Sequence, residues 1–310
     1  MKNKNKARVL INANQKGGVG KTTTATMEAV IAALPNFNFK VLLIDWDGQG
    51  NATSLLGKTF NANFPCSIMH CIENNDLQMG ITELSENLHM IAGAKDIKNL
   101  VYFLENKYPN SDPNFIENRT FHFSKLLDSI KDNYDFIIID VGPSTDIKVD
   151  NAMVCADYIT IIQETQTYSY EGSKDIAYEY FQTLIDDFGS KVPTQIMGVL
   201  CVLFTQRKDH HNKVINDTYN TFGRNYTYTT NVTNFSRLEE YPDYGINVVD
   251  YHDRRVFATY ADIFAETLER ISFIEEQGDI PEDYIYQKQY LNGNKLTKLA
   301  KELDLNGYTK

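Results

Sequence analysis

The sequence predicts a doubly wound α/β fold, in which a mostly parallel β-sheet is flanked by helices on both faces. Short apolar runs rich in valine, leucine and isoleucine alternate along the chain with segments of helical spacing. The runs have no polar face, as expected for strands buried on both sides of a parallel sheet. Because no internal repeat or low-complexity linker interrupts this order, one large domain is expected for most of the chain.

Strands and helices are expected in alternation. The expected strands are residues 8–13, 40–45, 88–93, 135–140, 157–162 and 195–204. Helical spacing is found between them, for example at 22–34, 116–131, 170–188 and 253–275. After about residue 275 the pattern changes to a more polar segment, in which residues 294–305 have the spacing of one short helix. We therefore expect a domain over residues 1–275 and a C-terminal tail with a short helix over residues 276–310.

The composition limits the possible functions. With 42% hydrophobic and 23% charged residues the chain is typical of a globular protein, and no run reaches the roughly 20 apolar residues of a membrane span. No signal-peptide pattern follows the basic N-terminus, so a cytoplasmic location is expected. The formal net charge of −11 excludes a protein coated in positive charge, and any contact with nucleic acid must use a local patch. The four cysteines lack metal-ligand spacing and are expected to be reduced core residues.

A glycine-rich segment, NANQKGGVGKTTTAT at residues 12–26, joins the first expected strand to the first expected helix. Its glycines let the backbone approach an anion closely, and N–H groups of the loop and of the helix start direct positive partial charge toward that anion. Lys21 adds a full charge for the terminal phosphates, and the Thr22 hydroxyl is suited to Mg²⁺. The residues expected to bind the nucleotide are Lys16, Gly17, Gly18, Val19, Gly20, Lys21, Thr22 and Thr23.

Two carboxylates end apolar strands. Asp45 and Asp140 are expected at the carboxyl edge of the sheet beside the glycine loop, where ligands bind in this architecture. Carboxylates at this place can hold the waters of a Mg²⁺ shell. Thr22, Asp45 and Asp140 are therefore the expected metal site, with the two carboxylates acting through water.

The chain resembles a known group of ATPases. KGGVGKTT at residues 16–23 resembles the deviant Walker A motif of the ParA/MinD group of P-loop ATPases, in which the early lysine is the signature residue. Further segments resemble this group in the same order: VLLIDWDGQGNATSLLG at 41–57, YDFIIIDVGPS at 134–144, ADYITIIQETQTYSYEG at 156–172 and SRLEEYPDYGINVVDYHDRRVFATYADIFAETL at 236–268. The resemblance covers roughly residues 7–272. It implies a P-loop NTPase fold and an ATPase that uses ATP and Mg²⁺.

The resemblance also implies roles in catalysis. Asp47 matches the residue that orients the attacking water, and Lys21 matches the lysine that neutralises the phosphates. Lys16 matches the lysine that crosses to a second subunit and touches the nucleotide there, which implies a homodimer that depends on ATP. Gly48 and Gly142 depart from the usual pattern, because prolines are common at these positions. Both changes leave the carboxylates intact but bear on the stiffness of their loops.

The ParA-type resemblance implies DNA segregation. In this interpretation an ATP-bound dimer binds DNA non-specifically on the nucleoid, and a centromere-binding, ParB-like partner stimulates hydrolysis and release. The segment DWDGQGNATS favours this branch over MinD. The candidate DNA-binding residues are Arg237, Arg254 and Arg255, although acidic residues at 239, 240, 243, 250 and 253 interleave with them.

The alternative is a MinD-like ATPase that cycles on and off a membrane. The observation that favours this alternative is the segment 294–305, where three leucines fall on one helical face with lysines nearby, a pattern typical of helices that lie on anionic membranes. The segment is short and lacks aromatic anchors, so we expect it to dock on protein instead of a membrane. Two further expectations concern other residues. The adjacent pair His210 and His211 is expected to face solvent, and the adenine is expected around the loop after residues 198–204 and the segment 231–237.

Overall fold

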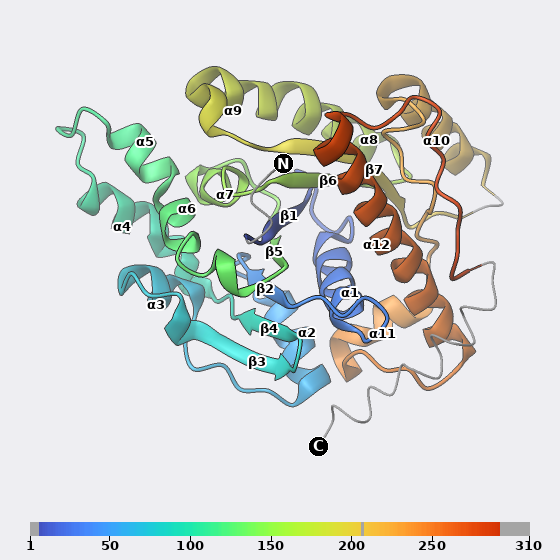
Figure 1. Cartoon of the computed structure of the whole chain (residues 1–310), viewed down its shortest axis with the longest axis horizontal. Coiled ribbons are helices and arrows are strands. Elements are labelled where there is room, and N and C mark those ends of the chain that lie inside the picture. Colours follow the sequence, from blue (N-terminus) through green and yellow to red (C-terminus); the bar gives the residue numbers. More distant parts are fainter. Residues whose placement is uncertain (1–5, 206–207, 292–310) are drawn as a thin grey trace.

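The computed structural model describes residues 6–205 and 208–291, which form a central seven-stranded sheet (Figure 1). The strand order is β3-β4-β2-β5-β1-β6-β7, and all neighbours are parallel except β3 and β4. The strands are β1 (Arg8–Ala13), β2 (Val41–Asp45), β3 (Ile81–Ser85), β4 (Leu88–Ile91), β5 (Phe136–Asp140), β6 (Tyr158–Glu164) and β7 (Gln195–Val202). The predicted doubly wound fold is therefore confirmed.

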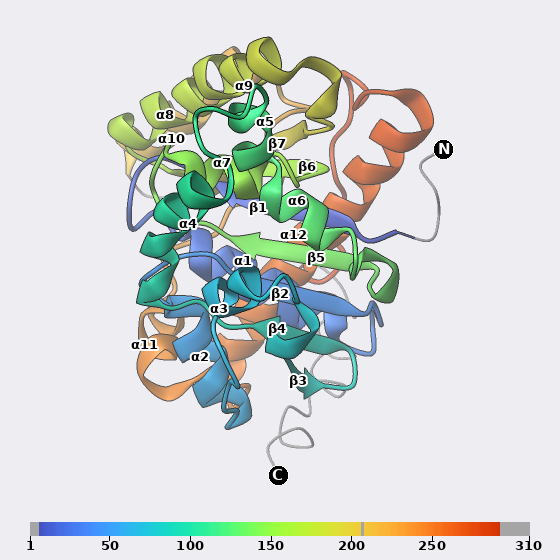
Figure 2. The same cartoon turned by 90° about the vertical axis from the view of Figure 1, so that its left-hand side faces the viewer.

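Helices cover both faces of this sheet, as Figures 1 and 2 show. The helices are α1 (Lys21–Ala33), α2 (Asn51–Phe60), α3 (Ile68–Glu73), α4 (Leu100–Lys107), α5 (Phe115–Thr120), α6 (His122–Leu127), α7 (Ile147–Met153), α8 (Thr167–Lys174), α9 (Phe181–Phe188), α10 (Asp209–Phe222), α11 (Ser236–Tyr244) and α12 (Tyr251–Gln277). One apolar core joins the sheet to α1, α2, α11 and α12, and a second core joins its other face to α3, α4, α6, α7 and α9. None of the described helices is long and apolar enough to cross a bilayer.

The central strands are buried because their sequences are apolar on both faces. Every residue of β2 and of β5 is buried, including the aspartate at the end of each strand. The N-terminal ends of the two strands lie together at one edge of the sheet and their carboxyl ends at the other. Since β1 pairs with β5 in the same direction, the loops that follow β1, β2 and β5 meet at one edge.

Three local features differ from the sequence prediction. β3 was not expected, because it is an edge strand that pairs antiparallel with β4 and exposes polar residues such as Glu83. The segment 116–131 forms two short helices that are separated at Phe121, whose ψ of 13° interrupts the helix. The segment 170–188 contains a π-helix, Asp175–Tyr180, between α8 and α9.

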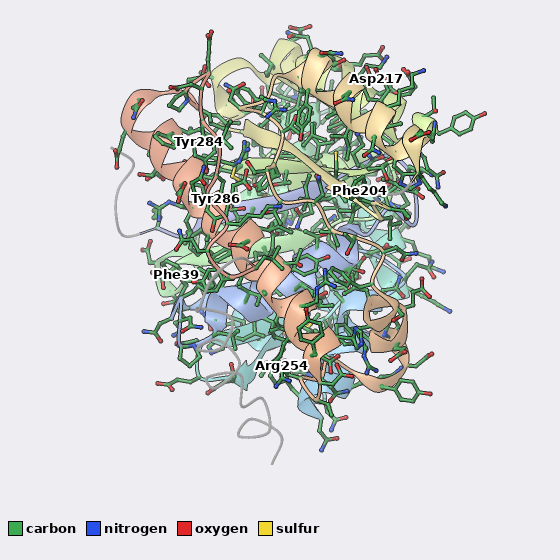
Figure 3. All side chains as sticks on the ribbon, turned by 90° about the vertical axis from the view of Figure 1, so that its right-hand side faces the viewer. Phe39, Phe204, Asp217, Arg254, Tyr284 and Tyr286 are labelled. Carbon is green, nitrogen blue, oxygen red and sulfur yellow. The ribbon has the colours of Figure 1, made fainter. Side chains whose placement is uncertain are left out.

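The described part of the tail packs against the domain (Figure 3). α12 ends at Gln277, and Gly278 has the left-handed φ of 86° that favours glycine after a helix. Farther on, the buried carboxylate of Asp262 accepts hydrogen bonds from the Tyr286 hydroxyl and from the backbone N–H groups of residues 289–291. The short helix expected within 294–305 lies outside the described residues, and the division at residue 275 stays a prediction.

Candidate nucleotide-binding site

The glycine loop has the backbone geometry of an anion cradle. Gly18 and Gly20 have φ values of 76° and 90°, which residues with a Cβ atom rarely adopt. α1 starts directly after Gly20, and no side chain caps its first N–H groups. The start of the helix therefore directs uncapped N–H groups and the positive end of its dipole toward the space in front of the loop.

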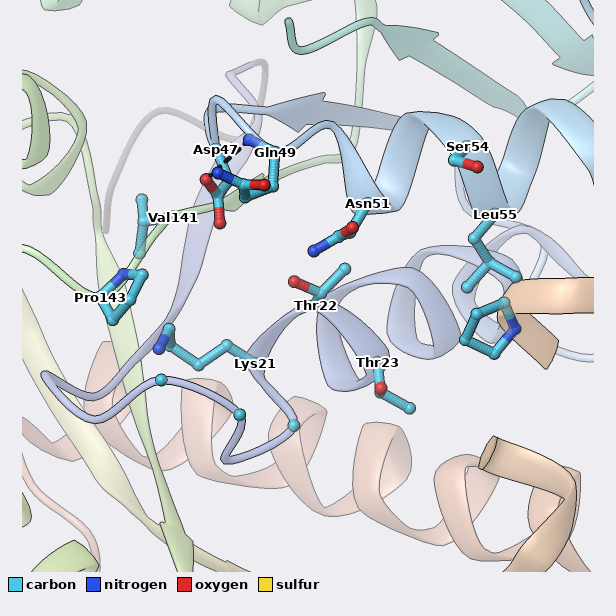
Figure 4. A pocket seen from close by; sticks show the side chains of 14 residues that line it. Lys21, Thr22, Thr23, Asp47, Gln49, Asn51, Ser54, Leu55, Val141 and Pro143 are labelled. Atoms are coloured by element: carbon cyan, nitrogen blue, oxygen red, sulfur yellow. Dashed lines mark hydrogen bonds between the residues drawn. The ribbon is translucent and has the colours of Figure 1, made fainter. Parts of the chain in front are cut away.

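A pocket of about 510 Å³ lies in front of this loop (Figure 4). It is lined by Gly17, Gly18, Gly20, Lys21, Thr22, Thr23, Asp47, Gln49, Asn51, Ser54, Leu55, Val141, Pro143 and Pro242. Two residues of the expected nucleotide-binding set are not in this lining: Val19, which is buried in the core, and Lys16. The pocket has the size and polarity of a small-molecule site.

Several residues of this pocket were not expected from the sequence. Gln49 and Asn51 belong to the quoted motif at 41–57, which was the available signal. Pro242 comes from α11, and no local pattern placed it beside the glycine loop. The segment 231–237, one of two places where the adenine was expected, does not contribute to this lining, and the other, the loop after residue 204, includes residues 206 and 207, which lie outside the described residues.

Lys21 lies in a partly desolvated position. Its side chain is buried, and its Nζ donates a hydrogen bond to the backbone carbonyl oxygen of Lys16 at 2.9 Å. Burial lowers the pKa of Lys21, while the charges of Asp140 and Asp47 oppose this shift. The lysine is therefore held within its own loop, at the edge of the pocket.

Asp45 and Asp140 lie side by side at the ends of β2 and β5, in direct register. The Asp45 carboxylate accepts hydrogen bonds from the Thr53 backbone N–H at 2.9 Å, the Thr53 hydroxyl at 2.7 Å and the Asp47 backbone N–H at 3.1 Å. Burial raises the pKa of Asp45 to about 6, although these hydrogen bonds act against the shift. Asp45 therefore ties the start of α2 to the end of β2.

The Asp140 carboxylate has a different environment. It is fully buried, and neither of its oxygen atoms has a hydrogen-bond partner with acceptable geometry among the described residues. Burial raises the pKa of Asp140 well above the ordinary value, and the negative charge of Asp45 raises it further. The neighbouring Thr22 hydroxyl lowers the pKa, but by less than burial raises it. Buried, unpartnered oxygen atoms of this kind are costly unless another group satisfies them.

Asp47 lies close to the loop after β5. Its Oδ1 accepts a hydrogen bond from the Gln49 backbone N–H at 3.0 Å, which Figure 4 shows as a dashed line. A Cβ atom at Gly142 would lie 3.3 Å from the Asp47 Cγ, so the glycine permits this close approach. Trp46 lies between Asp45 and Asp47 in the sequence. Its indole N–H donates a hydrogen bond to the Lys148 carbonyl oxygen at 2.8 Å.

The candidate DNA-binding arginines do not form a free basic patch. Arg237 pairs with Glu240 at 2.6 Å, with Asp250 at 2.5 Å and with Asp253 at 3.5 Å. Arg255 is exposed and lies over the Phe235 ring, and Arg254 is half-buried near the start of α12. The charge of Arg237 is therefore neutralised by its neighbours, and Arg255 is the exposed one of the other two candidates.

The expectation that both histidines face solvent was wrong for His211. This residue is buried, and its Nδ1 contacts the Thr165 hydroxyl at 2.5 Å and the Thr205 backbone N–H at 3.3 Å. His210 is exposed as expected. The four cysteines are free, and Cys71, Cys155 and Cys201 are buried.

A glycine loop between a strand and a helix, with a buried lysine and strand-end carboxylates at one sheet edge, defines a P-loop nucleotide-binding protein. Comparison with known proteins narrows this class. A family model described as an AAA domain matches residues 7–192. The chain belongs to this family and is a ParA-type P-loop ATPase.

Three similar proteins illustrate the relationship. An uncharacterised protein of Pseudomonas putida is 30% identical over 79% of this chain and 88% of its own length. The sporulation initiation inhibitor protein Soj of Bacillus subtilis is 28% identical over 84% of this chain and 97% of its own. A solved plasmid partition protein of Borrelia burgdorferi has a TM-score of 0.62 at 23% identity, over 84% of this chain and 99% of that one.

Proposed function

We propose that this protein is a DNA-segregation ATPase whose ATP-bound form is a homodimer. The dimer binds DNA without sequence preference and is released when a ParB-like partner stimulates hydrolysis. The observation that carries the proposal is the separation of the two lysines: Lys21 lines the pocket, whereas Lys16 does not. A cation that its own pocket does not use would be able to serve the phosphates of a facing copy once it leaves its partner on its own chain. Relatives named as a chromosome partitioning protein ParA of Myxococcus xanthus and a chromosome-partitioning ATPase Soj of Treponema pallidum support the same function.

The pocket residues are assigned to ATP by their chemistry. Residues 16–23 would bind the nucleotide, with Lys21 at its terminal phosphates and Lys16 reaching the nucleotide of the second copy. Asp47 would orient the attacking water, because it lines the pocket from the opposite side to the loop and carries a carboxylate that can accept a proton or hold a water. Binding ATP across two copies makes assembly depend on the nucleotide.

The residues at the sheet edge fit Mg²⁺. The unpartnered oxygen atoms of Asp140 lie beside the Thr22 hydroxyl, and both are hard oxygen donors. No group of three or more acidic, histidine or cysteine side chains among the described residues could hold a metal alone, so water and phosphates would complete the shell. Mg²⁺ bound there would neutralise charge on the phosphates during transfer. Asp45 would act on this shell through water.

Contacts with DNA are assigned to Arg254 and Arg255, with a smaller share for Arg237 because its charge is already paired. Contacts with phosphates need no base readout and displace counterions, which makes them sensitive to salt. A protein of this kind would be cytoplasmic and associated with the nucleoid, without a stable membrane contact.

The test measures assembly and DNA binding together. Purified protein is examined by light scattering with ATP and Mg²⁺ or with ADP, and then mixed with two unrelated DNA duplexes at low and high salt. We expect dimers only with ATP, and equal affinity for both duplexes that falls steeply with salt. An ATP-bound protein that ignores both duplexes but sediments with anionic liposomes would instead establish the MinD-like alternative.

A further inference from the structure

The signature lysine is held by its own chain. Lys16 Nζ lies 2.7 Å from the Glu164 Oε2, and the two side chains are 34% and 14% exposed. The Lys16 backbone N–H donates to the Asn14 Oδ1 at 2.8 Å, which fixes the start of the side chain as well. The ammonium group therefore lies over the end of β6 and not in its own pocket.

Glu164 is itself held in place. It ends β6, and its backbone N–H donates to the Ser169 hydroxyl at 2.9 Å. Its second carboxylate oxygen, Oε1, accepts a hydrogen bond from the Gln166 side chain at 2.5 Å. One oxygen is thus bound by a neighbour of the same loop and the other by Lys16. Pairing of a half-buried ammonium with a fixed carboxylate is a charge-assisted interaction, stronger than an ordinary exposed ion pair.

This ion pair competes with any other use of Lys16. For the lysine to reach the phosphates of a facing copy, its Nζ has to leave the Glu164 carboxylate. The attraction that replaces the lost ion pair grows with the charge on the phosphates, and ATP carries one more phosphate group than ADP. The competition between a carboxylate and a polyphosphate therefore favours release with ATP more than release with ADP.

We infer that Glu164 is a positioning residue that restrains Lys16 in the single chain and makes assembly of two copies selective for the triphosphate. The inference rests on the proposed function, because it requires that Lys16 acts across the dimer. Glu164 touches neither nucleotide nor metal in this scheme and acts only through the lysine. Removing its charge weakens the restraint, lowers the concentration of protein at which ATP-bound dimers form, and allows dimers with ADP.

The test compares Glu164→Gln with wild type by analytical ultracentrifugation, with a non-hydrolysable ATP analogue, with ADP and without nucleotide. We expect dimerisation of Glu164→Gln with the ATP analogue to be about tenfold tighter, and dimers to be measurable with ADP. Glu171→Gln is the matched control, since Glu171 is an exposed carboxylate of the next helix that pairs only with Lys174 in this structure. This control should behave as wild type.

A double variant separates restraint of Lys16 from a general change in charge. Glu164→Gln should have no effect on dimerisation, ADP dimers or ATP affinity in a Lys16→Gln background, because its partner is missing. An equal effect in both backgrounds, or identical dimerisation of Glu164→Gln and wild type while the wild type dimerises with ATP, would overturn the inference. If the wild type and Glu164→Gln both stay monomeric with every nucleotide, the proposed dimer fails as well, and this result is distinct from the others.

Discussion

Asp45 and Asp140 end neighbouring strands in direct register, yet the Asp45 carboxylate accepts three hydrogen bonds, whereas Asp140, beside the Thr22 hydroxyl, has no partner of acceptable geometry among the described residues. The same residue type therefore has two uses at one sheet edge. Asp45 accepts hydrogen bonds from N–H groups at the end of β2 and the start of α2, whereas Asp140 is buried beside Thr22 and Lys21 without a well-formed hydrogen bond. Substitution of each should therefore have a different effect on the free energy of unfolding.

We predict that Asp45→Ala lowers the free energy of unfolding by about 2–3 kcal/mol, because it leaves buried N–H groups without an acceptor. Asp140→Asn should leave the stability without nucleotide unchanged or slightly raised, because it removes an unpartnered buried charge. Asp140→Asn should nevertheless abolish the strengthening of nucleotide binding by Mg²⁺. Urea denaturation and nucleotide titration with and without Mg²⁺ check both effects. Equal destabilisation by the two variants would contradict the assignment.

The second prediction concerns Glu28, which is fully buried in α1 and accepts one hydrogen bond from the Asn12 side chain at 2.8 Å. Burial raises its pKa to about 7. Since a glutamate of the unfolded chain titrates near 4.3, the folded state binds the proton more tightly. Its contribution to stability is therefore present at low pH and lost as the pH rises from about 4 to 7.

Glu28→Gln should accordingly raise the free energy of unfolding by about 2–3 kcal/mol at pH 8, and by much less at pH 4.5. The amide keeps an oxygen that can accept the Asn12 hydrogen bond. Urea denaturation at the two pH values measures the difference, with Glu171→Gln as the exposed control. A gain of equal size at both pH values would show that the charge of Glu28 is not the cause.

The third prediction separates the two lysines. Lys21→Ala should abolish ATP binding, because the pocket loses its only lining lysine among the described residues. Lys16→Gln should keep nucleotide binding but lose dimers that depend on ATP. Isothermal titration and light scattering with ATP and Mg²⁺ distinguish the two losses. Dimers of normal strength in Lys16→Gln would show that Lys16 has no role between subunits.

The fourth prediction tests Asp47 through its own carboxylate and through its neighbour. Asp47→Ala should slow single-turnover hydrolysis with little loss of ATP affinity, because orientation of water is needed only toward the transition state. Gly142→Ala should slow it as well, since the new Cβ would lie 3.3 Å from the Asp47 Cγ and shift the carboxylate. Both variants should accumulate as ATP-bound dimers on DNA. Hydrolysis at the wild-type rate by Asp47→Ala, with partner and DNA present, would assign the role to another group.

The fifth prediction concerns DNA. The double variant Arg254→Ala and Arg255→Ala should weaken binding of unrelated duplexes equally, and should reduce the slope of log affinity against log salt by about 2. Arg237→Ala should have a smaller effect on the slope, because three carboxylates already neutralise this arginine. Fluorescence anisotropy with labelled duplexes at several salt concentrations measures the slopes. A larger change of slope for Arg237→Ala than for the double variant would reverse the assignment.

The glycine loop and the strand-end carboxylates could be predicted because local sequence determines them. A glycine with positive φ, a lysine at the start of a helix and an aspartate at the end of an apolar strand are features of a few consecutive residues. Parallel pairing then brings these strand ends to one edge, so Lys21, Asp45 and Asp140 were expected together and are found together. Their roles toward ATP and Mg²⁺ remain predictions.

Other features depend on packing between distant segments, which no local pattern encodes. Pro242 reaches the pocket because α11 packs on α2, where the Lys58 ammonium donates to the Pro242 carbonyl oxygen at 2.6 Å. The ion pair between Lys16 and Glu164 joins a residue of the glycine loop to the last residue of β6. His211 was expected in solvent, since a charged stretch surrounds it, but it is buried and contacts the hydroxyl of Thr165, the residue directly after β6. Tertiary structure decides all three.

Trp46 gives the protein a built-in optical probe. It is the single tryptophan of the chain, it is 3% exposed, and its ring lies against Phe123 with the centroids 4.2 Å apart. Tryptophan emission therefore comes from one known place, which lies in the sequence between Asp45 and the pocket residue Asp47. We expect a rearrangement of that segment on nucleotide binding to change the indole environment, so that the fluorescence of unlabelled protein would report it.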